Sequence, residues 1–410
     1  MRFFLAVIFV FVSVNTAESG QAFTLRQCID YSSVNNSNIK MSQYDVNTAR
    51  RKVQEQIGSA LPQVTASGGV TDNLELNTTL MPGELFGYPA GTFIPLKSGT
   101  QYSVSTGVDV DQKIFDASFW VGLKSAKISS EQAALNLRKT KESTGYSVCT
   151  SYFKALILGK KCDVLKEIAG AAAKTLESTQ TKFDYGAAKK IDVDKIRVAY
   201  HNDQSQYQQM ELSFRQAMNN LKYAMGMPVD SNLSLADTSI ADEAGVIAVP
   251  DVSDNAYEDR TDYQLEKVNL RLEEAGRNKN IAGYMPSLSF TASYSYKTMP
   301  DELTFRDDWY ESSSIGLNLN IPIFDGFQRH AKILQSKYGI EKAMENIRYT
   351  EQSIKLDISN YETTLKDAVD NIKNEKENLE LARGVYANMQ LACQQGTGSF
   401  IELVDAENSL

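Results

Sequence analysis

The sequence predicts a mixed α/β membrane protein that combines long antiparallel coiled-coil helices with four β-strands per chain. Three observations predict this class: an internal two-fold repeat, four segments in which apolar and polar residues alternate, and proline-free stretches with heptad spacing. Because the same order of elements occurs twice, the two halves of the chain are expected to fold alike.

The repeat is marked by landmarks that recur at a nearly constant offset. Pro62 and Pro286 are 224 positions apart. The offset then falls by about 15, so the first half is expected to have a longer hairpin loop, the Pro- and Gly-rich segment 77–99. The later landmarks, 209 or 210 positions apart, are Phe115-Asp116 with Phe324-Asp325, and Gly186 with Gly396.

Strands are expected at about 63–76, 100–114, 286–297 and 312–323. In the second of these, valine side chains such as Val108 and Val110 alternate with Ser and Asp side chains. Segments of about ten residues with small polar groups on one face suit the wall of a membrane barrel, with lipid outside and water inside. A half-buried sheet of a soluble protein would give the same alternation.

Long helices are expected at 117–185, 187–227 and 327–395. The third has 69 residues, which gives a helix roughly 100 Å long at 1.5 Å per residue. Its apolar residues recur at alternating steps of three and four, the spacing of a coiled coil. A single compact domain does not contain such a rod, and a soluble coiled-coil scaffold has no use for two hairpins with a polar face.

Four strands cannot close a barrel, because the smallest membrane barrels have about eight. Open sheet edges are not tolerated in lipid, so several chains must pool their strands. Two chains would give eight strands around a lumen filled by side chains, whereas three chains would give twelve strands around a lumen wide enough for water.

The N-terminus, residues 1–22, has the pattern of a cleaved secretory signal peptide, with Arg2, the apolar run 3–14 and small residues at Ala17 or Ala22. An uncleaved anchor is the alternative, but the run of 12 residues is shorter than the ~20 that a spanning helix needs. No later apolar stretch has spanning length, so membrane segments are expected to be β. The net charge of -9 argues against a nucleic acid partner.

Four short motifs in the repeat frame resemble those of one known family. They are residues 223–228 (YAMGMP), 281–288 (IAGYMPSL), 319–326 (LNIPIFDG) and 396–406 (GTGSFIELVDA). Each is weak alone, but the four occur in the right order on a duplicated frame. The chain therefore resembles TolC-type outer-membrane factors over essentially its whole mature length.

This resemblance implies a homotrimer whose twelve strands form one β-barrel through the outer membrane, continued by an α-barrel of helices across the periplasm. It also implies an inner-membrane pump and a periplasmic adaptor as partners, with substrates leaving passively in efflux or type I secretion. The alternative is a soluble periplasmic coiled-coil adaptor or scaffold protein. A hydrolase is disfavoured because no nucleophile and base pattern occurs, and no cofactor or metal site is expected.

The expected domain organisation follows the repeat. A first structural repeat at 23–227 is followed by an inter-repeat equatorial segment at 228–256 and a second structural repeat at 257–410. The return helix of the first repeat runs from Ile191 to about Met227, whereas its counterpart from Ile401 reaches only Leu410. About 27 residues of the C-terminal helix are therefore expected to be missing.

The helix tips are candidate docking sites. Gly186 and Gly396 each follow a long helix, where a tight or left-handed turn favours glycine, and a simple helix stop is the alternative explanation. The resemblance implies that these turns receive the adaptor. The docking residues would be Tyr185, Gly186, Ala187, Gln395, Gly396 and Thr397.

An acidic pair follows the second tip. Glu402 and Asp405 are three apart on a helix, so they lie on the same side, and Asp192 and Asp194 are their counterparts in the first repeat. Solvated surface carboxylates are the simpler reading. The resemblance implies a periplasmic gate, in which acidic rings around a pore would attract cations and disfavour anions. Gly398 departs from the family pattern, which has an arginine there, so the latch of the closed state is expected to differ.

The strand–helix junctions form the last group of candidate residues. They lie where the alternating segments meet the helical ones, and several belong to the motifs above. The junction residues are Pro62, Phe115, Asp116, Pro286, Pro322, Phe324, Asp325 and Gly326.

Overall fold

A computed structural model of the chain describes residues 22–236, 256–302, 308–395, 397–398 and 400–409. The expected signal peptide therefore lies outside the described residues, apart from Ala22. The chain divides into two compact units. We call residues 45–135 with 260–351 the sheet unit, and residues up to 44 with 136–259 and 352–410 the helical unit. The predicted combination of long helices with four principal strands is confirmed.

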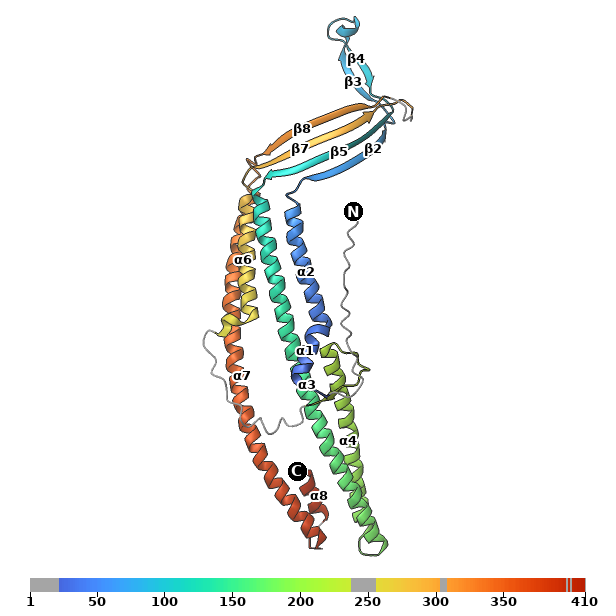
Figure 1. Cartoon of the computed structure of the whole chain (residues 1–410), viewed down its shortest axis with the longest axis vertical. Coiled ribbons are helices and arrows are strands. Elements are labelled where there is room, and N and C mark those ends of the chain that lie inside the picture. The colour runs from blue at the N-terminus through green and yellow to red at the C-terminus, as the bar shows by residue number, and fades with distance from the viewer. Residues whose placement is uncertain (1–21, 237–255, 303–307, 396, 399, 410) are drawn as a thin grey trace, which may run out of the picture. The chain divides into compact units, whose positions relative to one another are not determined.

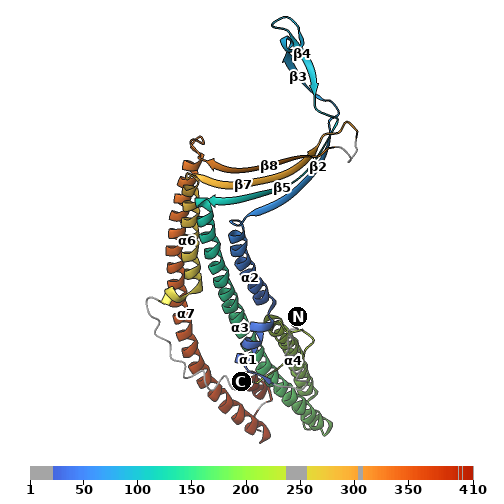
Figure 2. The same cartoon turned by 45° about the horizontal axis from the view of Figure 1, so that its top comes forward.

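The sheet unit contains a four-stranded antiparallel sheet (Figures 1 and 2). Its order is β2 (Gln63–Asp72), β5 (Tyr102–Phe115), β7 (Ser287–Thr298) and β8 (Tyr310–Asn320), so β2 and β8 are the edges. The central pair, β5 with β7, joins the two halves of the repeat. The sheet thus unites both repeats within one chain.

Four helices run side by side from the sheet in this unit (Figure 1). They are α2 (Ser37–Gly58), α6 (Thr261–Ala282) and the first parts of α3 (Ala117–Asp184) and α7 (Gln328–Gln394). Ile128 of α3 packs against Val268 and Ala275 of α6 in a small buried core. Leu135 and Leu272, both partly buried, pack against this core.

The segment expected to be a long hairpin loop contains a second, separate hairpin. It consists of β3 (Asn77–Pro82), the 3-10 helix η1 (Gly83–Phe86) and β4 (Phe93–Ser98). The pairs Leu80–Pro95 and Met81–Ile94 lie across from each other. The first-repeat connection between β2 and β5 is therefore the longer one, as expected, but it contains a hairpin that was not foreseen. Proline is tolerated in an isolated two-stranded ribbon because every strand there is an edge.

The helical unit holds the larger core. It contains α1 (Leu25–Asn35), α4 (Lys190–Met225), α8 (Phe400–Asn408), the second parts of α3 and α7, and a short parallel pair of β1 (Ala22–Phe23) with β6 (Ser234–Leu235). Its main core consists of Cys28, Val148, Tyr152, Leu156, Leu221 and Met225, which come from α1, α3 and α4. Among the helices that the structure describes, none has an apolar stretch long enough to cross a bilayer.

Several element boundaries differ from the expected ones. β2 ends at Asp72 because Asn73 turns the chain, its backbone N–H and its side chain donating to the carbonyls of Gln101 and Thr100. β8 covers 310–320 and stops two residues before Pro322, which has no N–H for a ladder. α4 begins at Lys190 because residues 187–189 still belong to the turn, and a 3-10 helix η3 (Ala256–Asp259) precedes α6.

Candidate functional site

The four-stranded sheet has two chemically different faces. One cross-strand row is Thr65, Asp109, Ser293 and Ser314, in which the hydroxyls of Ser293 and Ser314 are 2.7 Å apart. The neighbouring row, on the opposite face, is Val64, Val110, Ala292 and Ile315. In these two rows the register therefore separates small polar side chains from aliphatic ones.

The aliphatic face is open to the surroundings. Ile315 is 79% exposed, and Leu317 and Leu319 on the same strand are also exposed. An exposed apolar face of this kind needs a partner surface or lipid. A sheet with an apolar face toward lipid and a polar face toward water matches the wall of a membrane pore.

The first-repeat junctions are short turns. Pro62 lies between α2 and β2, where Gln63 donates from its side chain to the carbonyls of Gly58 and Leu61. Phe115 ends β5, and the carboxylate of Asp116 accepts a 2.9 Å hydrogen bond from the backbone N–H of Ser118. Asp116 thereby satisfies a free N–H at the start of α3, as a helix cap does.

The second-repeat junction is tied more strongly. Gly326 and Phe327 adopt positive φ angles of 65° and 64°, so the chain turns sharply before α7. Asp325 accepts hydrogen bonds from the backbone N–H and the Nε of Arg329, at 2.9 and 2.6 Å. Arg329 also donates to the carbonyl of Gly283, 2.9 Å away, and stacks over the ring of Tyr284. The guanidinium thus joins the start of α7 to the end of α6.

The remaining junction residues surround this tie. Pro286 lies between α6 and β7, and Pro322 follows β8. Phe324 packs edge-on against Phe327, with ring centroids 5.5 Å apart. Sequence reasoning missed Arg329, although its spacing of four from Asp325 is the spacing of a helical ion pair.

The first helix tip forms a compact turn. α3 ends at Asp184, and Gly186 has a φ of 75°. Gly186 donates to the carbonyl of Phe183, and Ala187 donates to that of Lys182, so the end of α3 is closed by a left-handed cap. Tyr185, 86% exposed, projects from this turn.

The second tip is closed differently. Gly396 lies outside the described residues, and Gln395, after the end of α7, is exposed. The backbone N–H groups of Thr397 and Gly398 both donate to the carbonyl of Ala392 at 3.0 Å. A Cβ added at Gly398 would lie 2.9 Å from the Cβ of Ala392, so no side chain fits without a shift of the turn. This contact explains why glycine suits the position where the family resemblance implies arginine.

The expected gate residues occupy two helices of the helical unit. Glu402, in the first turn of α8, and Asp405 are exposed. Asp192 lies in the first turn of α4, and Asp194 is 4.0 Å from Arg197 on the same helix. All four carboxylates therefore lie within the first two turns of α4 or α8.

Sequence reasoning missed a second acidic group, which lies in the helical unit. Glu407 of α8 is half-buried, and burial, with the nearby carboxylate of Asp203 on α4, raises its pKa. Burial also raises the pKa of Asp203, and burial followed by the charge of Glu407 raises that of Tyr386 on α7. The three groups come from three helices, so no local sequence pattern could have joined them.

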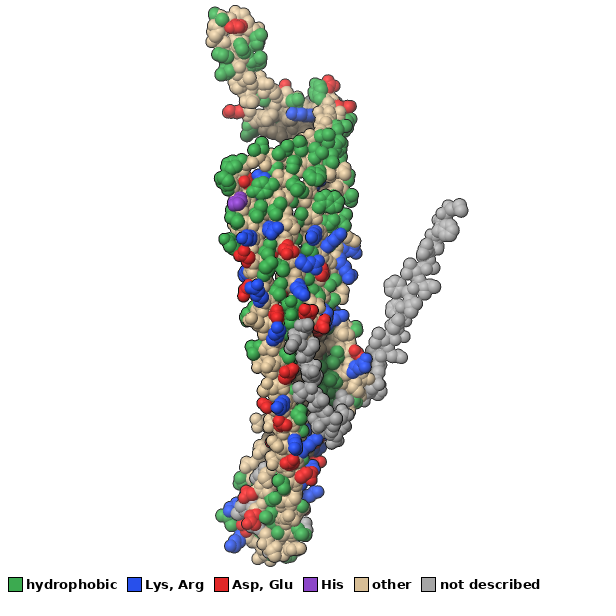
Figure 3. All heavy atoms as spheres, turned by 90° about the vertical axis from the view of Figure 1, so that its left-hand side faces the viewer, with side chains coloured by type: hydrophobic (Ala, Val, Ile, Leu, Met, Phe, Trp, Pro, Cys, Tyr) green, Lys and Arg blue, Asp and Glu red, His purple; other side chains and the backbone are tan. Residues whose placement is uncertain are grey.

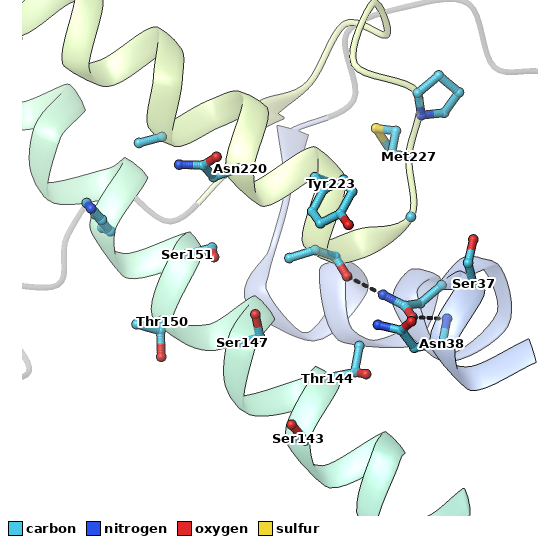
Figure 4. A pocket seen from close by; sticks show the side chains of 16 residues that line it. Ser37, Asn38, Ser143, Thr144, Ser147, Thr150, Ser151, Asn220, Tyr223 and Met227 are labelled. Atoms are coloured by element: carbon cyan, nitrogen blue, oxygen red, sulfur yellow. Dashed lines mark hydrogen bonds between the residues drawn. The ribbon is translucent and has the colours of Figure 1, made fainter. Parts of the chain in front are cut away.

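A polar cavity of about 860 Å³ lies where α1 and α2 meet α3 and α4 (Figure 4). Ser143, Ser147 and Ser151 line it from α3, and Asn220 and Tyr223 line it from α4. Its wall is fixed by one residue between α1 and α2. Asn36 donates to the carbonyl of Ala224 at 2.8 Å and accepts from the backbone N–H of Asn38 at 2.8 Å.

Comparison with known proteins gives one consistent result. The family model described as "Outer membrane efflux protein" matches residues 29–227 and 252–410. The chain is 20% identical over 313 residues to Outer membrane protein TolC of Vibrio cholerae serotype O1, covering 75% of this chain and 70% of that protein. It is 22% identical over 419 residues to Outer membrane protein TolC of Escherichia coli K12, covering 95% of this chain and 77% of that protein.

A solved structure supports the same fold. The outer membrane protein VceC from Vibrio cholerae superposes with a TM-score of 0.70, covering 94% of this chain and 89% of that chain. The sequence identity in this superposition is 13%. The likeness therefore concerns the arrangement of helices and strands.

Proposed function

The chain belongs to the outer membrane efflux protein family, and we propose that three copies form one export duct that works with an inner-membrane pump and a periplasmic adaptor. It is an outer-membrane efflux channel protein and not an enzyme. Its location in the outer membrane agrees with the secretory signal expected at residues 1–22.

The observation that carries the proposal is the two-faced sheet with open edges. Among the described strands, β2 and β8 each leave one row of backbone N–H and C=O groups without a strand partner. In lipid each unpaired backbone group costs several kcal/mol, so the edges must pair with neighbouring copies. Three copies give twelve strands and a lumen wide enough for water, with the polar row of Asp109 and Ser293 facing inward.

The gate proposal rests on charge repetition. With three copies, each exposed carboxylate of α8 is placed three times around the pore axis. Glu402 and Asp405 would then make two stacked acidic rings, and Asp192 and Asp194 would add carboxylates from α4. Such rings concentrate cations and repel anions at the periplasmic entrance.

The docking proposal concerns the two helix tips. Tyr185, Gly186 and Ala187 present an exposed aromatic ring on a rigid capped turn, and Gln395 and Thr397 flank the second turn. Aromatic side chains on preformed turns are suited to binding a protein partner, because little conformational freedom is lost. A photoreactive amino acid at Tyr185 should crosslink to the adaptor in cells, whereas one at Tyr146, also exposed but far along α3, should not.

The test of the whole proposal is the mass and conductance of the detergent-extracted protein. Light scattering should give three chains per particle, and planar bilayers should show ion conductance. A soluble monomer or dimer that needs no detergent would contradict the duct and favour the coiled-coil adaptor. Equal crosslinking from Tyr185 and Tyr146 would leave the duct intact and contradict only the docking surface.

A further inference from the structure

The four helix ends next to the sheet carry an unusual excess of positive charge. We compare the eleven residues nearest the sheet on each helix: 48–58 of α2, 117–127 of α3, 272–282 of α6 and 328–338 of α7. Together they hold ten Lys or Arg and three Glu, although the whole chain has a net charge of -9. Positive charge is therefore concentrated at one level of an acidic protein.

Most of these cations are available for another partner. Arg329 is held by Asp325 and Gly283, but the other nine are exposed. Among the ion pairs of the described residues, only Lys337 of these nine takes part, at 3.8 Å from Glu341. We call these nine exposed Lys and Arg side chains the basic collar.

Each helix repeats one arrangement of apolar and basic side chains. An exposed apolar residue lies nearer the sheet, and a collar residue lies three, four or seven positions farther away on the same helical face. The pairs are Ile57 with Arg50 on α2, Trp120 with Lys124 on α3, Ile281 with Arg277 on α6, and Leu334 with Lys337 on α7. Figure 3 shows hydrophobic side chains next to the sheet on the face that it displays, and Lys and Arg, interspersed with Asp and Glu, beyond them.

The apolar surface of the sheet continues onto these helix ends. Ile323, Phe324 and Phe327 at the junction are all more than 70% exposed. Trp120 follows at 63% exposure, one turn into α3. Eleven helical residues span about 16 Å at 1.5 Å per residue. Aliphatic, aromatic and basic side chains therefore follow one another over a distance close to half of the ~30 Å hydrocarbon core.

We propose that the helix ends enter the inner leaflet of the outer membrane and that the basic collar binds the phosphate groups of anionic phospholipids there. The inference rests on the proposed function, because it requires the sheet to span that membrane. Lipid is favoured as the occupant because the surface is continuous with the lipid-facing side of the sheet. The positive charge complements anionic headgroups, to which Lys and Arg near a membrane surface are attracted.

Trp120 is a built-in probe, since the chain has only two tryptophans, Trp120 and Trp309. The Trp309→Phe variant of the full mature chain is inserted into vesicles of phosphatidylcholine and phosphatidylglycerol that contain a brominated lipid. Bromine close to the headgroup should quench Trp120 more than bromine at the end of the acyl chain. Quenching should be at least twofold stronger when brominated phosphatidylglycerol replaces brominated phosphatidylcholine.

A second pair of variants isolates the charge. Lys124→Gln with Lys127→Gln should abolish the preference for phosphatidylglycerol while bilayer conductance persists. The matched control is Lys160→Gln with Lys161→Gln, two exposed lysines farther along α3, which should leave the preference unchanged.

The outcomes separate this inference from the proposed function. A protein that inserts and conducts but whose Trp120 is not quenched overturns the lipid contact alone. An equal loss of preference in both lysine variants overturns the collar as a specific surface. A protein that does not insert into vesicles overturns both proposals.

Discussion

The Nε of Arg329 lies 2.6 Å from Oδ2 of Asp325, one helical turn earlier in the chain. The side chain of Arg329 is only 15% exposed and also reaches the carbonyl of Gly283. One guanidinium therefore fixes the sharp turn after β8 and joins two helices that are about 46 residues apart in the sequence. In the corresponding first-repeat turn, the backbone N–H groups of Ser118 and Phe119 donate to the carboxylate and the carbonyl of Asp116.

Arg329→Lys should destabilise the sheet unit by about 1–3 kcal/mol, because an ammonium cannot keep all of the charge-assisted hydrogen bonds of a planar guanidinium. Thermal unfolding of the detergent-extracted protein measures the change. The control is Arg348→Lys, since Arg348 is 74% exposed and contacts only an exposed glutamate, Glu345, among its ion-pair partners in the described residues. Equal losses in the two variants would contradict the role assigned to Arg329.

Gly226→Ala should weaken the contact between α4 and the α1–α2 bend. Gly226 has a φ of 74°, and a Cβ there would lie 2.7 Å from the Cα of Asn36 and 2.8 Å from the carbonyl oxygen of Asn35. We expect the free energy of unfolding to fall by about 1–3 kcal/mol, since both backbone strain and a backbone clash oppose the substitution. Gly170→Ala in α3, where nothing lies within 4 Å, should be neutral or stabilising. Urea denaturation of both variants tests the difference.

Regular elements could be predicted because their patterns are local. Alternation in β5 and heptad spacing in α7 each depend on neighbours a few residues away, and both elements exist. The contact of Asn36 with Ala224 joins positions 188 residues apart, so no periodicity could reveal it. The β3–β4 hairpin was missed for another reason. Its prolines favour turns, and the pairing of Met81 with Ile94 across the two strands leaves no local pattern in the sequence.

For the candidate sites, the sequence shows the residue types and their spacing but not which helices bring them together. The spacing of Glu402 and Asp405 places them on one side of a helix, and α8 holds both. The spacing of Glu407 from these two gives no reason to join it to Asp203, because that proximity depends on the packing of α8 beside α4. The glycine at 398 likewise became explicable only when its closeness to Ala392 was known.

Neutralising the acidic pair of α8 should reduce the cation preference of the channel. Glu402→Gln with Asp405→Asn removes six carboxylates from a trimer, so the field that attracts cations at the entrance weakens. Reversal potentials under a salt gradient in planar bilayers should shift toward zero by a clearly measurable amount. The control Asp301→Asn with Glu302→Gln removes the same charge from two exposed residues that follow β7. An unchanged reversal potential in the α8 variant would rule out acidic rings.

The packing of α8 should depend on pH through Glu407. Its pKa is raised by burial and by Asp203, so the protonated form is favoured in the folded protein. The stabilising contribution is complete below the ordinary value for glutamate, near 4.3, and is lost as pH rises through the raised value. Asp203 contributes in the same direction, and Tyr386 is the titratable group that faces Glu407 from α7.

Amide hydrogen exchange in residues 400–409 measures this dependence when rates are corrected for intrinsic exchange. Protection should fall as pH rises from below the ordinary glutamate value toward neutrality. Glu407→Gln should make this fall clearly smaller, because a neutral amide cannot be deprotonated, while Asp203 still titrates. Glu380→Gln removes an exposed carboxylate of α7 that pairs with Arg383, and should retain the wild-type slope. If Glu407→Gln retains that slope as well, the carboxyl pair does not control the packing of α8 against α4.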